Sequence, residues 1–455
     1  MVRDVWKYFV AAIGQGAIRR IAVVALLLTG VAAGPAAAVP SFAVQTGLTC
    51  SACHVGGFGP QLTPVGRQFK LRGYTSRTKD FNLPFSAMAV ASYIHTAQNQ
   101  SGPPAPHFGV NDNVALDQAS LFIAGGVGAH FGGFVQTTYN GIDRTFSWDN
   151  ADLRAVTTLE GGGHNLLLGL SLNNSPGVQD VWNTLPAWGF PYTSSGLAPA
   201  PGAAPLMTGA FAQSVLGLTA YALLDDRVYL EAGAYDSLSP GLLRTLGSDP
   251  TASRIHGAAP YARAAYQFNS GAQNIEIGAF GLWASLYPGR DESTGTTDVY
   301  QDLGLDASYQ LAAASGRYTA NVRYTHERQA LRATQLLGGA ANVDNTLQDL
   351  RGDVSYYWKN KIGLTVGAFD TWGSADDMLF AGNRRFRPDS RGLTAQLDAT
   401  PWGDGASPFG RRFNMRFGLQ YTAYGQFEGA THNYDGLGHN ASDNNTVRLF
   451  SWVAF

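Results

Sequence analysis

The chain has few charged residues, only two cysteines and, beyond its first segment, no long apolar run. Lys, Arg, Asp and Glu make up 14 % of the 455 residues, and the formal net charge is −2, which argues against a nucleic-acid partner. No stretch after residue 38 is long enough for a membrane-spanning helix. Glycine and aromatic residues are abundant instead, with 55 Gly, 20 Tyr, 24 Phe and 9 Trp. This composition indicates a β-rich exported protein.

Residues 1–38 have the features of a cleaved secretory signal. Basic residues from Arg3 to Arg20 precede the apolar run "IAVVALLLTGVAAG", and Ala36 to Ala38 provide a small-residue cleavage site. The alternative is a membrane anchor that starts at Ile21, but the run falls short of the ~20 apolar residues of a span. Loss of four basic residues and one acidic residue changes the net charge from −2 to −5. We expect the mature chain to be exported.

Several segments within residues 84–455 alternate between apolar and polar side chains, as strands with two different faces do. In "DVYQDLGLDASYQL", Leu303 and Leu305 lie on one face, while Asp302 and Asp306 lie on the other. Glu327 shares the polar face of the next strand. We expect these carboxylates to face the lumen of a barrel and to tune its electrostatics. The predicted strands are ~9 to 14 residues long, which favours membrane-crossing strands over those of a soluble sandwich.

The links between the predicted strands take turns in length, which supports a transmembrane barrel independently. Short links such as "DDR" and "KNK" alternate with long polar links such as 96–114, 173–212 and 426–442, the pattern of an outer-membrane barrel. The terminal "NTVRLFSWVAF" resembles the C-terminal signature of bacterial outer-membrane proteins. The prediction is an all-β transmembrane barrel of about sixteen antiparallel strands, preceded by a small, mainly helical domain.

That small domain, residues 39–83, contains both cysteines of the chain in "CSACH". It is too short to build a sufficient core unaided, so we expect a covalent staple or a cofactor. A redox pair would need a βαβ setting, zinc would need further ligands, and a plain disulfide is the remaining alternative. The C-x-x-C-H pattern is typical of covalent haem attachment. It predicts one haem c, with thioethers to Cys50 and Cys53 and with His54 as the proximal iron ligand.

Other candidate haem contacts follow the motif. "TPVGRQFKLRGY" predicts a helix with Thr63 as its N-cap that ends at Gly73. On it, Arg67 and Lys70 lie three residues apart and are candidate propionate contacts, although a solvated basic face is an equal alternative. Val65, Phe69 and Leu71 are expected to pack on the macrocycle.

The second axial ligand is expected from the first strand of the barrel. Met88 and His95 are the candidates, and we favour Met88 because methionine ligation raises the haem potential. They lie seven residues apart in "FSAMAVASYIHTAQ", so a regular strand would turn them to opposite faces. At most one of them should face the lumen.

These segments resemble the fused outer-membrane cytochrome-porins of iron-oxidising bacteria, in which a mono-haem domain precedes a single barrel. The matching segments are "PSFAVQTGLTCSACH", "LTPVGRQFKLRGYT", "SAMAVASYIHT" and "NNSPGVQDVWNTLPAWGFPY" from Asn173. The resemblance implies a redox protein rather than a conventional enzyme. It implies an outer-membrane location, with the haem beneath or inside the barrel and electrons passing from extracellular Fe(II) to a periplasmic carrier such as a soluble cytochrome.

Two further functions stay open at the level of sequence: a diffusion porin with a structural or regulatory haem, and a conduit for outward electron flow. The barrel itself would have outer-membrane lipid as a partner. An external loop offers oxygen and imidazole groups for transient Fe(II) binding, although an ordinary hydrated loop is the simpler interpretation. Those groups are Glu428, His432, Asp435, His439 and Asp443.

Overall fold

The computed structural model describes residues 41–78, 85–185, 191–405, 407–410 and 413–455. The expected signal, 1–38, and the expected domain boundary between residues 83 and 84 lie outside the described residues. The strands are β1 (Phe85–Thr96), β2 (Asn113–Val127), β3 (Phe131–Asn140), β4 (Thr145–Gly161), β5 (His164–Asn173), β6 (Val215–Leu224), β7 (Val228–Ser237), β8 (Arg254–Ile255), β9 (Ala259–Ser270), β10 (Gln273–Tyr287), β11 (Asp298–Ala313), β12 (Gly316–Ala330), β13 (Asp344–Trp358), β14 (Ile362–Gly373), β15 (Ser390–Ala399), β16 (Asn414–Gln426) and β17 (Thr446–Ala454).

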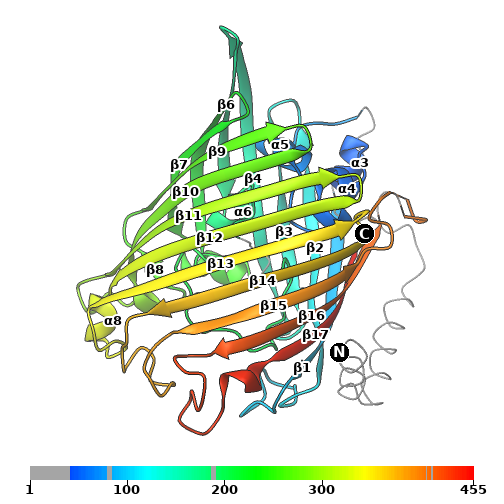
Figure 1. Ribbon diagram of the computed structural model, residues 1–455. Coiled ribbons are helices and arrows are strands. Elements are labelled where there is room, and N and C mark those ends of the chain that lie inside the picture. The colour runs from blue at the N-terminus through cyan, green and yellow to red at the C-terminus, as the bar shows by residue number, and fades with distance from the viewer. Residues whose placement is uncertain (1–40, 79–84, 186–190, 406, 411–412) are drawn as a thin grey trace, which may run out of the picture.

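The strands form a closed antiparallel barrel (Figure 1). Among the described residues, sixteen strands follow one another around the wall, and the two-residue β8 pairs with the end of β10. The first strand, β1, pairs with both β2 and β17, which closes the ring. Beside this seam, Phe455 exchanges two backbone hydrogen bonds with Ala87, of 2.8 and 2.9 Å. The predicted barrel of about sixteen strands is confirmed.

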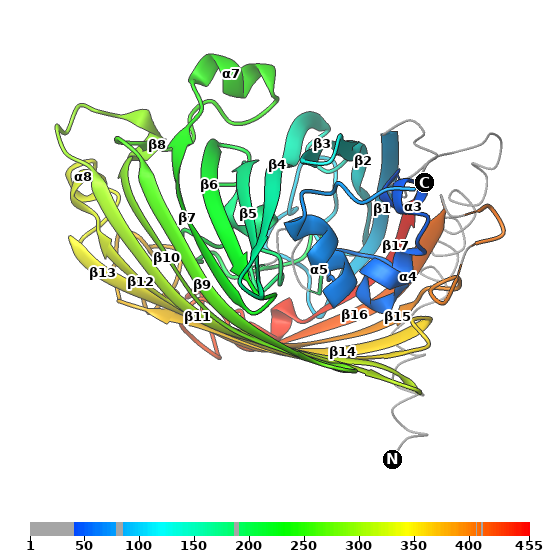
Figure 2. The same ribbon diagram turned by 90° about the horizontal axis from the view of Figure 1, so that it is seen from above.

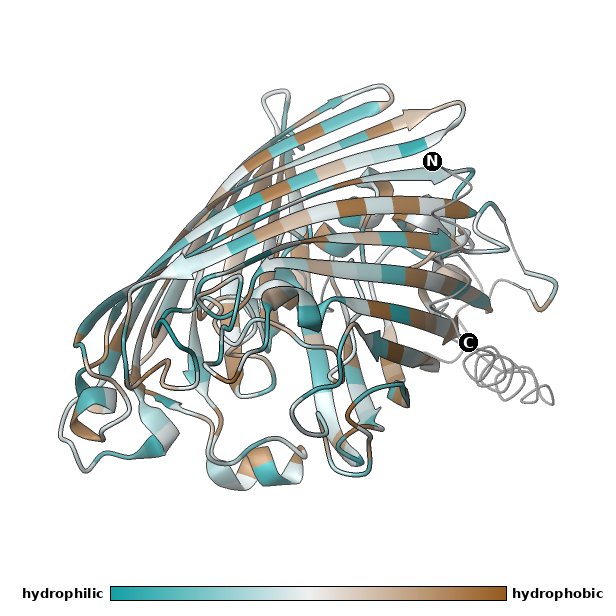
Figure 3. Cartoon of the chain, turned by 60° about the horizontal axis from the view of Figure 1, so that its bottom comes forward, coloured by the Kyte–Doolittle hydropathy of each residue, from teal (hydrophilic) through white to brown (hydrophobic). Residues whose placement is uncertain are grey.

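The wall has an apolar outer face and a polar inner face, because successive side chains of a strand point to opposite sides. Leu303 and Leu305 on β11 are 52 % and 63 % exposed on the outside, whereas Asp302 and Asp306 are buried within the barrel. The same alternation of hydropathy is visible along other strands (Figure 3). An apolar outer band around a closed barrel is the arrangement of a barrel that spans a lipid bilayer.

The two ends of the barrel differ in the length of their links. Links 128–130, 162–163, 225–227, 271–272, 314–315 and 359–361 join strands at one end, called the short-turn end here, while most links at the long-loop end are much longer. Two links depart from the predicted rhythm. The link 141–144 is short although it lies at the long-loop end, and the link 400–413 is long although it lies at the short-turn end. The second of these contacts the N-terminal region.

Residues 41–78 form a helical region, called the N-terminal module, inside the short-turn end of the barrel (Figure 2). It contains α3 (Ser41–Thr46), α4 (Cys50–Cys53), the short 3-10 helix η1 (Val55–Gly57) and α5 (Pro64–Leu71). Within the described residues no helix is long and apolar enough to cross a membrane. The remaining helices are α6 (Pro176–Gln179), α7 (Pro240–Thr245), η2 (Pro288–Arg290), α8 (Arg332–Leu336) and η3 (Ala441–Asn444).

A long link from β5 to β6 also folds into the lumen. Its described residues, 174–185 and 191–214, are called the inner loop here. The carboxylates of the barrel wall hold it, because Glu327 accepts from the backbone N–H of Leu206 at 2.6 Å and Asp302 accepts from that of Met207 at 2.7 Å. Arg323 donates to the backbone carbonyl of Thr184 at 2.8 Å. The lumen is therefore occupied by the N-terminal module at one end and by the inner loop next to it.

Candidate haem site

The cysteine motif forms one turn of helix at the start of a closed loop. The N–H of His54 donates to the carbonyl of Cys50 at 2.8 Å, and the N–H of Thr63 donates to the carbonyl of Cys53 at 2.9 Å. The Thr63 hydroxyl accepts from the N–H of Gly66 at 3.2 Å, as expected for an N-cap of α5. These bonds bring α5 back against the motif. The helix ends at Leu71, two residues earlier than predicted from Gly73.

The loop after the cysteine motif needs glycine at two positions where its backbone lies very close to another backbone segment. Gly57 has φ +78°, and a Cβ there would lie 2.4 Å from the Cα of Gly403 in the long link 400–413. A Cβ on Gly66 would lie 2.2 Å from the carbonyl oxygen of Cys53. A larger residue at either position would push the motif away from the barrel or from α5.

The two thiols are free, and the imidazole beside them is partly buried. Burial raises the pKa of both thiols, that of Cys53 to about 11. Burial also lowers the pKa of His54 to about 4, while the nearby Arg416 charge contributes in the same direction. His54 is therefore neutral at physiological pH, which is the form that binds a metal ion. Its Nδ1 atom has no hydrogen-bond partner among the residues that the structure describes.

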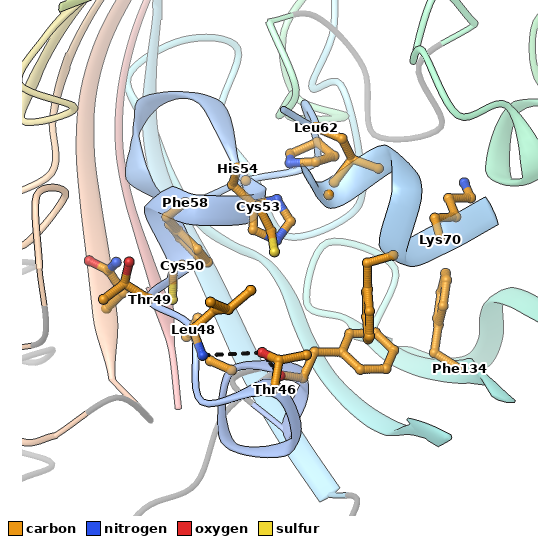
Figure 4. Close-up of a pocket in the computed structure, with 18 of the residues that line it drawn as sticks. Thr46, Leu48, Thr49, Cys50, Cys53, His54, Phe58, Leu62, Lys70 and Phe134 are labelled. Atoms are coloured by element: carbon orange, nitrogen blue, oxygen red, sulfur yellow. Dashed lines mark hydrogen bonds between the residues drawn. The ribbon is translucent and has the colours of Figure 1, made fainter. Parts of the chain in front are cut away.

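Both cysteines and His54 line one cavity, called the motif pocket here (Figure 4). The pocket contains about 1250 Å³ of unfilled space, its open mouth included. Figure 4 shows the imidazole of His54 close to the thiol of Cys53, with Leu48 and Leu62 at the same hollow. The rest of the lining is strongly aromatic, and it comes from the module and from the barrel wall: Phe42, Phe58, Phe69, Tyr74, Phe122, Phe134 and Trp452.

The residues present fit a haem. Two thiols and a neutral imidazole meet at a large, mainly apolar hollow, which is what a covalently attached porphyrin requires. In the described part of the chain, neither the Nδ1 of His54 nor the indole N–H of Trp452 has a hydrogen-bond partner, so two buried polar groups at this hollow are available to a bound group. A haem bound here would be a one-electron carrier.

The structure separates the two candidate distal ligands. Met88 on β1 is only 4 % exposed and lines the motif pocket. His95 lies on the same strand nearer the long-loop end, where its Nδ1 is 2.9 Å from a carboxylate oxygen of Asp112. The seven-residue spacing turns the two side chains to opposite faces, as the strand period predicts. The structure brings Met88 to the cysteine motif and leaves His95 away from it.

The two candidate propionate contacts are occupied by protein groups. Arg67 donates to the carbonyl of Leu62 at 3.1 Å and to the side chain of Asn274 on β10. Lys70 lines the pocket, and its Nζ donates to the backbone carbonyls of Val178 and Asp180 in the inner loop at 2.5 and 3.1 Å. Burial lowers the pKa of Lys70 to about 8. Both residues bind the module to its surroundings.

Of the three residues expected to pack on the macrocycle, only Phe69 lies at the motif pocket. Val65 is 51 % exposed, and Leu71 is fully buried against the barrel wall, in a cluster that includes Tyr221. The amphipathic helix α5 therefore presents only part of its apolar surface to the pocket.

Arg416 is a residue of the site that the motif did not reveal. It lies on β16, is 1 % exposed, and donates through Nη2 to the backbone carbonyls of Gly56, at 3.2 Å, and Phe58. Its guanidinium carbon is 6.0 Å from the ring centroid of Phe58. No carboxylate among the described residues lies within ion-pair distance of it. An arginine on the inner face of a strand is a signal in the sequence, but only folding shows which segment it meets.

Two of the external-loop carboxylates, Asp435 and Asp443, already have partners within the loop. His439 is 2.5 Å from Asp435, and the side chain of Asp443 accepts from the N–H of Asn440 at 2.7 Å. No group of three or more His, Cys, Asp or Glu side chains placed to hold a metal ion was found among the residues that the structure describes. The external loop considered for transient Fe(II) binding therefore has no preformed ligand cluster in the described part of the chain.

No protein-family model and no curated protein matches the chain. Among solved structures, the outer membrane channel DcaP of Acinetobacter baumannii is similar at 10 % identity, over 82 % of this chain and 97 % of that chain, with a TM-score of 0.46. An anion-selective porin from Comamonas acidovorans is similar at 9 % identity, over 82 % and 98 %, with a TM-score of 0.45. These values are too low to extend any property of those channels to this chain.

Proposed function

We propose that the protein is an outer-membrane electron-transfer protein with one covalent haem c in the motif pocket. Electrons would pass from an extracellular donor, for which we propose Fe(II), to a periplasmic carrier such as a soluble cytochrome. The single observation that carries this proposal is the convergence of Cys50, Cys53 and His54 on one aromatic hollow inside the barrel. The apolar outer band of the barrel supports the placement in an outer membrane.

The side chains of this chain would each have a limited role. Cys50 and Cys53 would hold the porphyrin covalently, and neutral His54 would bind the iron. Met88 would be the second axial ligand, because it is the candidate that lines the pocket. The aromatic residues exclude water from the hollow, and the bound haem would supply a one-electron redox couple.

The occupied lumen favours a conduit over a diffusion porin. The N-terminal module lies inside the short-turn end, and the inner loop lies beside it, so solutes would have to pass both. The Nζ of Lys70 and the backbone of the inner loop are in direct contact. Electrons can cross such a packed region, whereas a solute needs an open path.

The decisive experiment combines haem retention with rapid mixing. We expect haem to stay bound to the purified protein after acid-acetone extraction, and to be lost from a Cys50→Ser, Cys53→Ser variant whose barrel still folds. We also expect stopped-flow spectroscopy to show reduction of the oxidised protein by Fe(II). Haem that resists Fe(II) but accepts electrons from dithionite would disprove iron oxidation and leave the cytochrome assignment intact. Complete extraction of haem would disprove the covalent attachment.

A further inference from the structure

A second cavity lies in the lumen on the other side of the inner loop. This luminal chamber contains about 1570 Å³ of unfilled space, its openings included. The barrel wall contributes polar groups to it, among them Asn321, Arg323 and Asp353. In contrast to the aromatic motif pocket, the chamber offers hydrogen-bonding groups to a hydrated solute.

The luminal chamber and the motif pocket meet at one residue. Asn183 in the inner loop lines both cavities. Its side-chain amide donates to the backbone carbonyl of Pro60, in the loop that follows the haem motif. At this point Asn183 borders both the luminal chamber and the hollow that contains Cys53 and His54.

The chamber also continues toward the long-loop end. A third cavity, with about 1640 Å³ of unfilled space, shares Ala204 of the inner loop with the luminal chamber. Ala204 is exposed, so its small side chain leaves room at this junction. The three cavities therefore form a row from the long-loop end, past Ala204, to Asn183 and the motif pocket.

The partition between chamber and pocket is held in place by buried charges. Asp180 accepts from the N–H of Trp182 at 3.0 Å and from that of Leu185 at 3.1 Å. Thr184 donates to Asp306 of the barrel wall, and Arg323 donates to the carbonyl of Thr184 at 2.8 Å. These hydrogen bonds fix the residues on either side of Asn183, so the segment between the chamber and the motif pocket is held in position.

We propose that the electron donor is a small hydrated species that enters the luminal chamber and gives up its electron across the Asn183 partition. This inference rests on the proposed haem. One electron leaves the donor, which is oxidised, and the haem iron is reduced by one electron before the periplasmic carrier is reduced in turn. No bond forms or breaks. Because electron tunnelling falls off steeply with distance, a donor at Asn183 has a large advantage over a donor at the external loops.

The test uses the full-length holoprotein in liposomes and two forms of one donor. A ferrous chelate is added outside, either free or coupled to a dextran too large to enter the barrel, and haem reduction is followed by stopped-flow absorbance. We expect the free chelate to reduce the haem at least tenfold faster than the coupled form. Equal rates would overturn the proposal, because they would place electron transfer at the external surface.

Two variants narrow the chamber, and a third serves as a matched control. Ala204→Trp and Ala212→Trp add a large side chain at exposed positions of the chamber lining, and we expect each to slow reduction by the free chelate severalfold. Ala200→Trp lies on the same loop at an exposed position that lines none of the three cavities, and should leave the rate unchanged. Unchanged rates in both chamber variants would contradict the proposal.

The same samples separate this inference from the proposed function. The haem spectrum and midpoint potential of each variant are measured first, and only variants that keep both are compared. A protein without covalent haem would refute the proposed function. A haem that is reduced by the external chelate, but at a rate insensitive to the chamber variants and to the dextran, would refute the luminal donor site alone.

Discussion

The barrel wall and the N-terminal module are held together in different ways. In the wall, each strand pairs with its neighbours over most of its length, as β11 does with β12 from Val299↔Ala330 to Ala313↔Gly316. The α-helices of the module have only six, four and eight residues. Such short helices are marginal in isolation.

Hydrogen bonds and ring contacts with the barrel wall stabilise the short helices of the module. The amide of Gln45 bridges the carbonyl of Tyr74 and the N–H of Gly126 on β2, and the Tyr74 hydroxyl donates to Asp152 on β4 at 2.7 Å. Phe58 packs on Trp452 of β17 with ring centroids 4.7 Å apart. We therefore expect the wall to form without the module, and the module to depend on the wall and on the group that fills its pocket. Four predictions test this asymmetry.

The largest effect is expected when the module is removed. A chain that lacks residues 41–78 should still form the barrel, because the ring closes through β1 and β17 without it. Its lumen would lose the short-turn obstruction, so single-channel conductance in a planar bilayer should rise severalfold. Heat-modifiable gel mobility reports whether the barrel has formed. A deletion variant that fails to fold would show that the wall also depends on the module.

Truncation of Met88 should disturb the pocket but leave the wall intact. Met88→Ala removes a buried side chain from a cluster with Phe58 and Trp452, which typically costs about 2–5 kcal/mol. The near-infrared band typical of methionine-ligated ferric haem should vanish, and the midpoint potential should fall. His95→Ala is the control, because His95 lies outside the pocket. A parent protein that lacks this band, with a haem spectrum that changes in His95→Ala but not in Met88→Ala, would reverse the assignment.

Arg416 links the two regions, so its replacement should affect the haem more than the barrel. Arg416→Gln removes a buried positive charge from the carbonyls that follow His54. A nearby positive charge stabilises the reduced haem, so the potential should fall by about 60 mV, equivalent to a tenfold change in the one-electron equilibrium. Arg416→Lys keeps the positive charge, so its potential should stay close to that of the parent protein.

A matched control tests whether this effect is local. Arg448 on β17 is equally buried, but it is paired with Asp117 at 3.2 Å. It donates to Thr193 and Ser194 of the inner loop, at 3.2 and 3.0 Å, and not to the loop that follows the haem motif. Arg448→Gln should leave the potential within a few millivolts of the parent, by redox titration of both proteins. Equal shifts in the two glutamine variants would show that the potential reports a general loss of charge in the lumen.

The smallest effect is a pH dependence of module docking in the apoprotein. The pKa of Lys70 is lowered from 10.5 to about 8 by burial. Between these values the undocked module binds the proton and the docked module does not, so docking should become stronger as pH rises, by about 1.4 kcal/mol per pH unit. Hydrogen exchange of α5 amides, compared at each pH with Lys70→Met, isolates this contribution. If docking still becomes stronger with rising pH in Lys70→Met, the pH dependence belongs to another group.

The sequence predicts the wall well and the site only in part. Strict alternation in segments such as "DVYQDLGLDASYQL" marks both strand and face, because a period of two is set by the backbone itself. The C-x-x-C-H motif likewise predicts which residues meet, since they are neighbours in one helical turn. The partners of Arg67 and Lys70 could not be predicted from the sequence. A long basic side chain can reach several partners, and the fold decides which of them it meets.

What the sequence by itself determined is therefore local: the strands, their inward and outward faces, the N-cap at Thr63 and the grouping of Cys50, Cys53 and His54. Tertiary structure alone decided that β1 would turn Met88 to this motif, that Arg416 would meet the loop behind it from a distance of more than three hundred residues, and that Asn183 would separate two cavities. The reason is physical. Periodicity and short motifs act through neighbouring backbone units, whereas these contacts exist only after the ring has closed and the two internal segments have filled it.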